Sequence, residues 1–337
     1  MASPEDSRIA ALDGWRGVAI LLVLVDHAQG FFLGHIDSAL AATGQHGVNV
    51  FFVLSGFLIT SKLLESRVTL RQFYIRRFFR ILPTAVAYLL TMSIVGLASR
   101  QASFAPGELA SCLFFYRNYF RQHGSGLVAH FWSLSVEEQF YLLWPPILLF
   151  GGRSTALRFA ITGTAVCVLL RSVFWSYYNR LWFSEHTEVR ADALLLGCIL
   201  AMLLEMPAFR EWIGRHAKPI TLLGLVVWSF CCGWFYMLPP LPESAAVAAL
   251  IGVSVLRPAS WLPRILSWRP LAWLGVASYV VYIWQQYAFC LEGNMRRILA
   301  LMFMPAFVLL FHDLIEQPMI RLGRRLTTEK SLVMAEA

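Results

Sequence analysis

An arginine and a histidine are spaced to share one face of the first apolar segment. Arg16 and His27 are eleven residues apart, so at ~100° per residue they return to nearly the same helix face. They would lie ~16 Å apart along the axis. Acidic residues stand close to each, Asp13 near Arg16 and Asp26 next to His27. An imidazole can act as a general base near neutral pH. The alternative, a structural histidine bonded to a neighbouring helix, is left open by position alone.

A second candidate group is a pair of arginines. Arg77 and Arg80 lie three residues apart in the basic, aromatic stretch 74–83, and this spacing places both on one helix face. Two guanidinium groups side by side match the oxygens of a phosphorylated ligand. The same pair would also serve as a basic anchor at lipid headgroups, and the spacing does not distinguish the two roles.

The third group is a serine followed by two glutamates in the stretch 130–141. Ser135 and Glu138 share a helix face at a spacing of three, whereas Glu137 points about 100° away. A carboxylate beside an imidazole can orient the ring and stabilise its protonated form. We therefore expect one of the glutamates to partner His27. A capping serine with an acidic first turn explains Ser135 and Glu138 equally well.

Other polar and sulfur-containing residues give weaker signals. Ser55 and Gly56, in the stretch 47–57, are small enough to permit close helix approach. The histidines of the predicted outer loops and the six cysteines show no ligand spacing; these are His123, His130, His186, Cys112, Cys167, Cys198, Cys231, Cys232 and Cys290. We therefore expect no metal and no disulfide framework.

The composition is that of a membrane protein. Of 337 residues, 58% are apolar and 14% charged, and the mean hydropathy is +0.60. An ordinary soluble domain carries about 25% charged and 45–50% apolar residues, and it could not hide so much apolar surface. The net charge of +8 does not indicate nucleic acid, because the basic residues punctuate apolar runs.

These apolar runs predict an all-α integral membrane protein with about ten transmembrane helices. A helix that crosses the bilayer needs ~20 mostly apolar residues. The candidate spans are 15–34, 48–65, 81–98, 131–150, 156–177, 190–206, 218–237, 243–257, 271–291 and 298–320. The segment 108–120 is apolar but short, which favours an interfacial or re-entrant helix.

A single membrane domain is expected over residues 1–337, with spans in 9–322 and polar tails at 1–8 and 323–337. Glu5 and Asp6 precede the first apolar run, and a cleavable signal peptide would have a basic start instead. We therefore interpret that run as an uncleaved span. Most of the 28 Lys and Arg residues fall on the side of the N-terminus. Because basic residues accumulate in cytoplasmic loops, both termini are expected in the cytoplasm.

Taken together, these segments resemble the membrane-bound acyltransferase 3 family, the bacterial O-acetylases of surface polysaccharides. The resemblance covers nearly the whole chain. It is carried by the Arg16-to-His27 spacing, the stretch 51–57, the Arg77-x-x-Arg80 pair, the stretch 132–141 and the terminal Glu316-Gln317-Pro318. Any one of these motifs would be weak, but their occurrence in the right order is specific.

The resemblance implies transfer of an acyl group, usually acetyl, from cytosolic acyl-CoA to a hydroxyl of a cell-surface or exported glycan. It implies His27 as the catalytic residue and Arg16, Arg77 and Arg80 near the donor. Acyl-CoA would be a co-substrate, and no cofactor is expected. The expected partners are a glycan or lipid-linked sugar acceptor and membrane lipid, with no nucleic acid, and the expected location is the inner membrane.

Two positions depart from the family pattern. Asn49 stands where members usually carry an acidic residue, and Gln285 stands where histidine is common. We therefore expect no charged role at the first position. Any acceptor contact made by the second is in doubt.

Two chemical routes and two rival functions are compatible with these residues. His27 could take the proton of the acceptor hydroxyl during direct transfer, with Glu137 or Glu138 stabilising the imidazolium, or it could carry a covalent acyl group. A transporter or flippase of glycolipids or acyl groups would also have many spans and intramembrane charges. An acyltransferase acting on a small molecule such as a macrolide would share the chemistry and differ in its acceptor.

Overall fold

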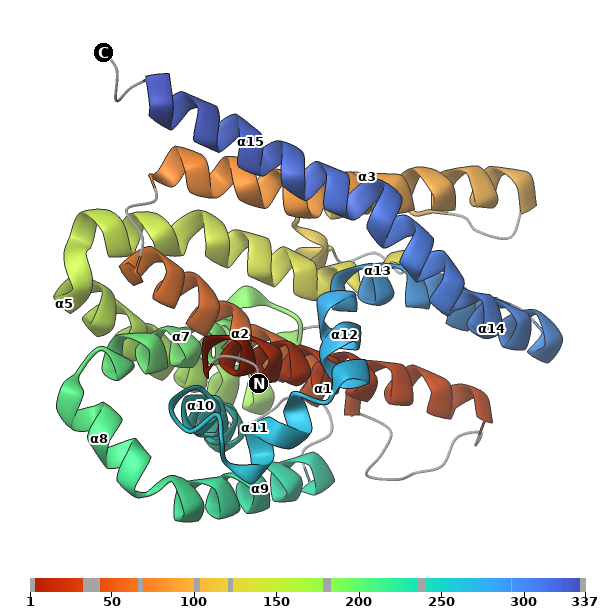
Figure 1. Cartoon of the computed structure of the whole chain (residues 1–337). Helices are drawn as coiled ribbons and strands as arrows, with labels where there is room; N and C mark the ends of the chain where they lie inside the picture. Colours follow the sequence, from red (N-terminus) through yellow and green to blue (C-terminus); the bar gives the residue numbers. More distant parts are fainter. Residues whose placement is uncertain are drawn as a thin grey trace. The chain divides into compact units, whose positions relative to one another are not determined.

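The computed structural model describes residues 4–32, 43–65, 69–99, 104–120, 124–177, 183–234, 241–291 and 293–333 (Figure 1). In these ranges the regular structure is helical, with no strand, so the all-helical prediction is confirmed. The chain divides into two compact units, each made of two sequence segments. Unit 1 comprises Met1–Glu65 and Val136–Ser278, and unit 2 comprises Ser66–Ser135 and Tyr279–Ala337.

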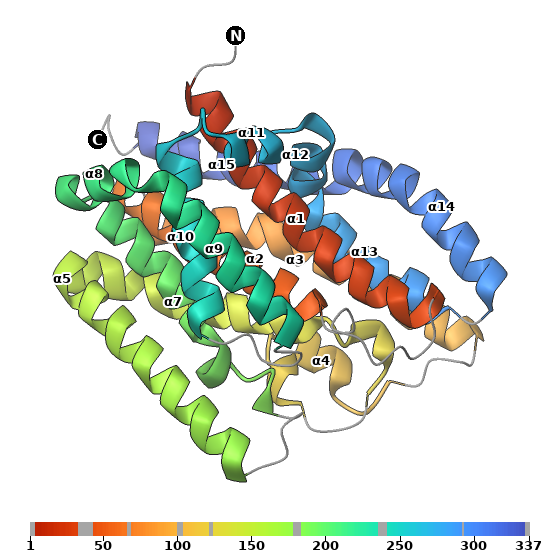
Figure 2. The ribbon, with the colours of Figure 1, turned by 90° about the horizontal axis from the view of Figure 1, so that it is seen from below.

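Unit 1 is a helix bundle that contains the first two helices and the middle of the chain. Its helices are α1 (Pro4–Phe32), α2 (Thr43–Glu65), most of α5 (Phe131–Tyr177), α7 (Thr187–Leu204), α8 (Pro207–Arg215), α9 (Ala217–Trp234), α10 (Leu241–Leu256), α11 (Trp261–Leu266) and α12 (Arg269–Val276). Helix α2 packs against α1 and α7, and α9 packs against α10 (Figure 2).

Unit 2 contains the remaining helices, several of them short. They are α3 (Leu70–Ser99), α4 (Glu108–Leu113), the 3₁₀ turns Arg117–Tyr119 and Gly126–Val128, α13 (Ser278–Cys290), α14 (Asn294–Phe311), a π-helical turn at His312–Glu316 and α15 (Gln317–Val333). Helices α3 and α15 run side by side (Figure 1). The Nε of Arg76 donates to the hydroxyl of Thr327 across this contact, at 2.9 Å.

Glycines let the helices of unit 1 approach backbone to backbone. A Cβ atom on Gly56 would lie 1.9 Å from the carbonyl oxygen of Leu194, and one on Gly197 would lie 2.1 Å from that of Val53. Helices α2 and α7 therefore touch through two glycines, one from each helix. Small residues serve this purpose in membrane bundles because they bring more of the two helices into contact. The close approach predicted for Gly56 is confirmed.

Polar side chains link neighbouring helices of unit 1. The indole N–H of Trp15 donates to the hydroxyl of Ser254 at 3.1 Å, which joins α1 to α10. Arg171 on α5 lies 2.5 Å from a carboxylate oxygen of Asp192 on α7. An arginine inside an apolar segment needs such a partner, because isolated charges are costly there.

Four helical stretches are long and apolar enough to cross a membrane: Thr43–Glu65, Leu70–Leu97, Gly126–Phe174 and Ile298–Thr327. Helices α7 and α8, which meet at 102°, would form a fifth as a bent pair. Length and composition thus support a membrane protein with four to five such helices among the described residues. The short helix expected within 108–120 is found as α4.

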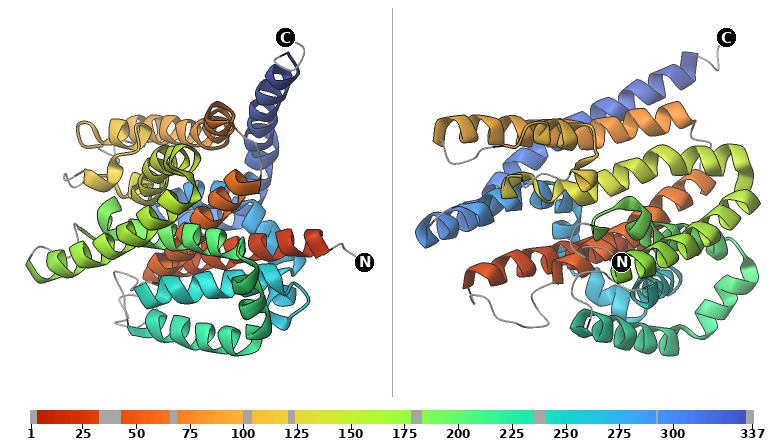
Figure 3. Two further views of the ribbon diagram at one scale, coloured as in Figure 1. Left: turned by 90° about the vertical axis from the view of Figure 1, so that its left-hand side faces the viewer. Right: turned by 180° about the vertical axis from the view of Figure 1, so that it is seen from behind.

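Two predicted spans lie on one bent helix, and a third predicted span is interrupted between two helices. Segments 131–150 and 156–177 both fall on α5, which is bent (Figure 3). Its two arms meet at Gly152, with φ 72° and ψ 168°. Glycine adopts this positive φ without steric penalty. Segment 271–291 is divided between α12 and α13 at Ala277. The gap predicted between 131–150 and 156–177 contains the bend at Gly152, whereas the interruption at Ala277 was not predicted.

The glycine contact predicts that Gly56→Ala destabilises the protein. The new methyl group would meet a backbone carbonyl, which cannot move aside as a flexible side chain can. Overpacking of this kind costs about 1–3 kcal/mol. Gly233→Ala on α9 is the matched control, because nothing lies within 4 Å of its Cβ position. Thermal unfolding in detergent should show a lower Tm for Gly56→Ala alone; equal Tm values for the two variants would contradict the contact.

Candidate functional site

Helix α1 carries the predicted Arg16-to-His27 pair on one unbroken helix. The helix runs from Pro4 to Phe32, so the spacing of eleven residues holds in the structure. Arg16 donates from Nη1 to Oδ1 of Asp13 at 2.9 Å. Their side chains are 27% and 17% exposed, so this ion pair is partly shielded from solvent.

The other end of α1 carries Asp26 and His27, and the side chain of Asp26 contacts the start of α2. Both side chains are half-buried. The carboxylate of Asp26 accepts a hydrogen bond from the backbone N–H of Gly44, and His27 and His46 lie within electrostatic range of it. A Cβ on Gly44 would lie 2.6 Å from Oδ2 of Asp26. His27 therefore lies beside a carboxylate whose position depends on the beginning of α2.

A serine–glutamate hydrogen bond joins α2 to α5. The hydroxyl of Ser55 donates to Oε1 of Glu137 at 2.7 Å, and Glu137 and Glu138 are both half-buried. Ser55 thus orients one of the two predicted carboxylates, in addition to standing next to the packing glycine Gly56. The expected pairing of either glutamate with His27 stays a prediction.

Ser135 lies in unit 2, and its hydroxyl forms hydrogen bonds with nearby backbone groups. Its hydroxyl donates to the carbonyl of Phe131 at 2.8 Å and accepts from the N–H of Arg117 at 3.1 Å. This arrangement ties the turn Arg117–Tyr119 to the first turn of α5. The supporting role in the site expected for Ser135 stays a prediction.

The predicted arginine pair lies on α3, and Arg80 interacts with the charge of Glu316. Glu316 is only 3% exposed, and its Oε2 lies 2.5 Å from Nδ1 of His312. The amide of Gln317 lies 3.1 Å from the other ring nitrogen of His312. The terminal motif therefore lies within electrostatic range of one of the two arginines within unit 2.

His312 was not among the residues that the sequence singled out. It belongs to the π-helical turn His312–Glu316, and such turns are frequent at functional sites. Its four-residue spacing from Glu316 was visible in the sequence. A histidine and a glutamate at that spacing are common on any helix, so the spacing alone was not informative.

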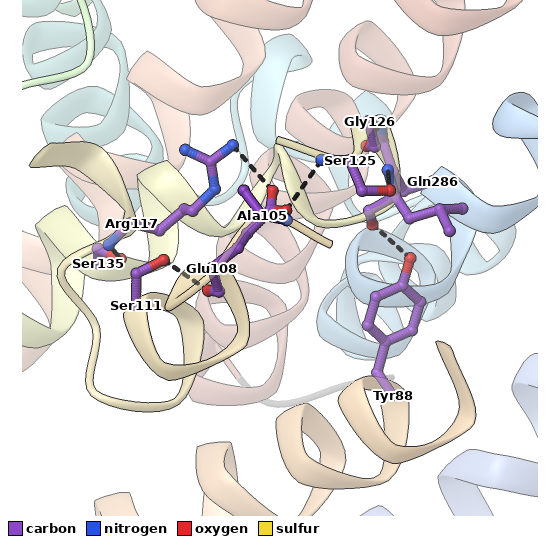
Figure 4. A network of polar contacts seen from close by, with 10 residues as sticks. Tyr88, Ala105, Glu108, Ser111, Arg117, Ser125, Gly126, Ser135 and Gln286 are labelled. Atoms are coloured by element: carbon purple, nitrogen blue, oxygen red, sulfur yellow. Dashed lines mark hydrogen bonds and ion pairs between the residues drawn. The ribbon is translucent and has the colours of Figure 1, made fainter. Parts of the chain in front are cut away.

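A buried network in unit 2 holds the chain around α4 (Figure 4). The carboxylate of Glu108, which is fully buried, accepts from the backbone N–H groups of Ala105 at 3.1 Å and Ser125 at 3.0 Å. It also lies 3.4 Å from Nη2 of Arg117. The amide of Gln286 donates to the carbonyl of Gly126 at 2.8 Å. One carboxylate thus joins three parts of an otherwise irregular segment.

Comparison with known proteins assigns these elements to a family. Residues 9–317 match a family described as an acyltransferase domain. The chain belongs to the membrane-bound acyltransferase 3 family. The expected resemblance is therefore confirmed, and the match spans both units of the structure.

Curated relatives with similar sequences are named as O-acetyltransferases. A Bacillus subtilis protein provisionally named a peptidoglycan O-acetyltransferase, YrhL, is 33% identical over 82% of this chain and 48% of its own length. The peptidoglycan O-acetyltransferase OatA of Listeria monocytogenes is 28% identical, again over 82% of this chain and 48% of its own length. The chain thus spans about half the length of these relatives. No solved structure matches it.

The Glu108 network predicts that Glu108→Ala destabilises unit 2. The substitution would leave two backbone N–H groups and Arg117 without their acceptor in a buried place. Removing one partner from a buried ion pair costs about 3–5 kcal/mol. The control is Glu211→Ala, because the side chain of Glu211 is 71% exposed in its pair with Arg215. Thermal unfolding of the purified variants should separate them by several degrees; equal stability would contradict the anchoring role.

Proposed function

We propose that this protein is a multi-pass O-acetyltransferase of the inner membrane. It would transfer an acetyl group from cytosolic acyl-CoA to a hydroxyl of a cell-surface or exported glycan. The observation that carries the proposal is the acyltransferase domain match over residues 9–317, together with the half-buried His27 beside Asp26 on α1. The glycan acceptor is proposed because relatives are named for acetylation of peptidoglycan.

In the proposed reaction His27 acts as the general base. Its imidazole takes the proton of the acceptor hydroxyl, and the oxygen attacks the thioester carbonyl carbon. The new C–O bond forms, the C–S bond breaks, and the coenzyme leaves as a thiolate that receives a proton. A neighbouring carboxylate stabilises the imidazolium. Asp26 is adjacent in sequence, and Glu137 is held in a fixed orientation by Ser55.

Arginines are the proposed ligands of the donor phosphates. Arg16, Arg77 and Arg80 have guanidinium groups that suit phosphate oxygens in geometry and charge. On α1 the distance from Arg16 to His27 is ~16 Å along the helix. Acyl-CoA is an extended molecule with phosphates at one end and the thioester at the other. A site for it needs positive charge at the phosphates and a general base near the thioester, separated in this way.

The proposal predicts that His27→Ala abolishes turnover without unfolding the protein. Removal of a general base lowers rates by about 10²–10⁴-fold. The control is His216→Ala, since His216 is exposed at the end of α8 and bonds its own helix. Purified protein in proteoliposomes would receive labelled acetyl-CoA and a glycan extract, and release of free CoA would be measured.

Each outcome of that experiment decides one part of the proposal. CoA release by His27→Ala at the wild-type rate would overturn the catalytic role of His27. Acyl label trapped on wild-type protein with donor alone, but not on His27→Ala, would replace direct transfer by a covalent acyl-His27 intermediate. Failure of the wild type to bind acetyl-CoA would exclude it as the donor.

We also propose ten membrane spans with both termini in the cytoplasm. Support comes from the described helices, which overlap every predicted apolar segment, with α5 contributing two arms and α12 and α13 following one another in segment 271–291. A phosphatase reporter fused after Arg121 is then expected to be active outside the cytoplasm, and one fused after Arg257 inactive. The opposite pattern would overturn this orientation.

A further inference from the structure

A cluster of fully buried polar side chains lies within unit 1, between the first turns of α2 and α10. Nδ1 of His46 is 2.8 Å from Oε2 of Glu243, and neither side chain is exposed. The amide of Asn49 donates to Oε1 of the same carboxylate at 3.1 Å. The hydroxyl of Ser244 in turn donates to the amide oxygen of Asn49 at 2.9 Å. Both oxygens of Glu243 are therefore fixed in orientation.

One atom of this cluster is not accounted for by these hydrogen bonds. Nε2 of His46 is buried, and within the described part of the chain it has no hydrogen-bond partner. Buried polar atoms in native proteins nearly always have one, so an exception indicates a bound water, an ion or a catalytic role. The other polar atoms of the cluster form hydrogen bonds that hold this ring in place.

The thiol of Cys232, at the end of α9, lies close to His46 and Glu243, and the three side chains carry atoms that bind metal ions. A ring nitrogen of His46, the sulfur of Cys232 and a carboxylate oxygen of Glu243 all lie within 4.8 Å of one another. The ligands of a tetrahedral zinc ion, at ~2.0–2.3 Å from the metal, lie about 3.3–3.8 Å apart. Metal binding would replace the hydrogen bond between His46 and Glu243, and small side-chain movements would then bring the three atoms to binding distance.

We propose that His46, Cys232 and Glu243 bind a divalent transition metal of the zinc class. A nitrogen, a sulfur and an oxygen donor suit zinc, whereas magnesium and calcium prefer oxygen alone. Cys232 loses its proton on binding, so the thiolate and the carboxylate together balance the charge of the ion. Asn49 donates to Glu243 and is itself held by Ser244, so the two act as the outer contacts that orient a ligand in established metal sites.

The proposed ion would tie α2, α9 and α10 together close to the candidate catalytic residues. Asp26, the neighbour of His27, lies within electrostatic range of His46. The site thus lies next to the end of α1 and within the same unit. Its existence does not depend on the acyltransfer chemistry, because binding is measured without donor or acceptor.

The test is metal binding by the purified full chain. After stripping and reloading with zinc, elemental analysis should give about one ion per chain. Titration with Co²⁺ should give the absorption band of a cobalt–thiolate bond. Cys232→Ser should lose that band and bind zinc at least ~100-fold more weakly. Cys231→Ser is the matched control, because Cys231 is the adjacent cysteine on α9 and lies outside the proposed set.

Every other outcome overturns the proposal. If zinc does not bind to the wild type, or binds equally to Cys232→Ser, the cluster is a hydrogen-bonded helix link and not a metal site. A cobalt–thiolate band that disappears in Cys231→Ser and persists in Cys232→Ser would assign the metal elsewhere. His46→Gln provides a second variant, and gel filtration establishes that each variant is folded before metal is measured.

Discussion

Polar groups buried in an apolar helix bundle must find their partners within the protein. Lipid offers no hydrogen bonds, so a charge or amide without a partner is energetically unfavourable inside the bundle as well as on its lipid-facing surface. Each buried charge described here has such a match: Arg171 meets Asp192, Glu108 meets Arg117, and Glu243 meets His46. Because these partners come from different helices or loops, satisfying one group also fixes the placement of two segments.

Close backbone approach is the second requirement, and the polar contacts between helices depend on it. Polar side chains reach across only when the helices lie near each other, and glycines make that possible between α2 and α7. Helix α2 shows how the two combine. Gly56 contacts α7 while the neighbouring Ser55 bonds Glu137 on α5. A change at this point would therefore affect both packing and the orientation of a candidate site carboxylate.

Within unit 1, the candidate chemistry gathers on few elements. Helix α1 carries Arg16 and His27, and α2 supplies Gly44 against Asp26, Ser55 against Glu137, and His46 in the buried cluster. Unit 2 has its own set, in which Arg80 and Glu316 interact. Helix α2 thus supports both the proposed acyltransfer residues and the proposed metal ligands, although the two sites are tested by separate experiments.

The sequence by itself determined the helical class, the membrane character, the family motifs and the same-face spacing of Arg16 and His27. These features depend on composition or on local periodicity. A same-face spacing read from the sequence holds in the structure wherever the helix is continuous. Only the tertiary structure decided that Ser55 bonds Glu137, that Glu108 anchors a loop segment and that His46 meets Glu243. Those partners are far apart along the chain or lie in irregular segments, so no local spacing reports them. The gap between segments 131–150 and 156–177 indicated a break in the apolar pattern, but only the structure shows that the two arms join in one bent helix at Gly152.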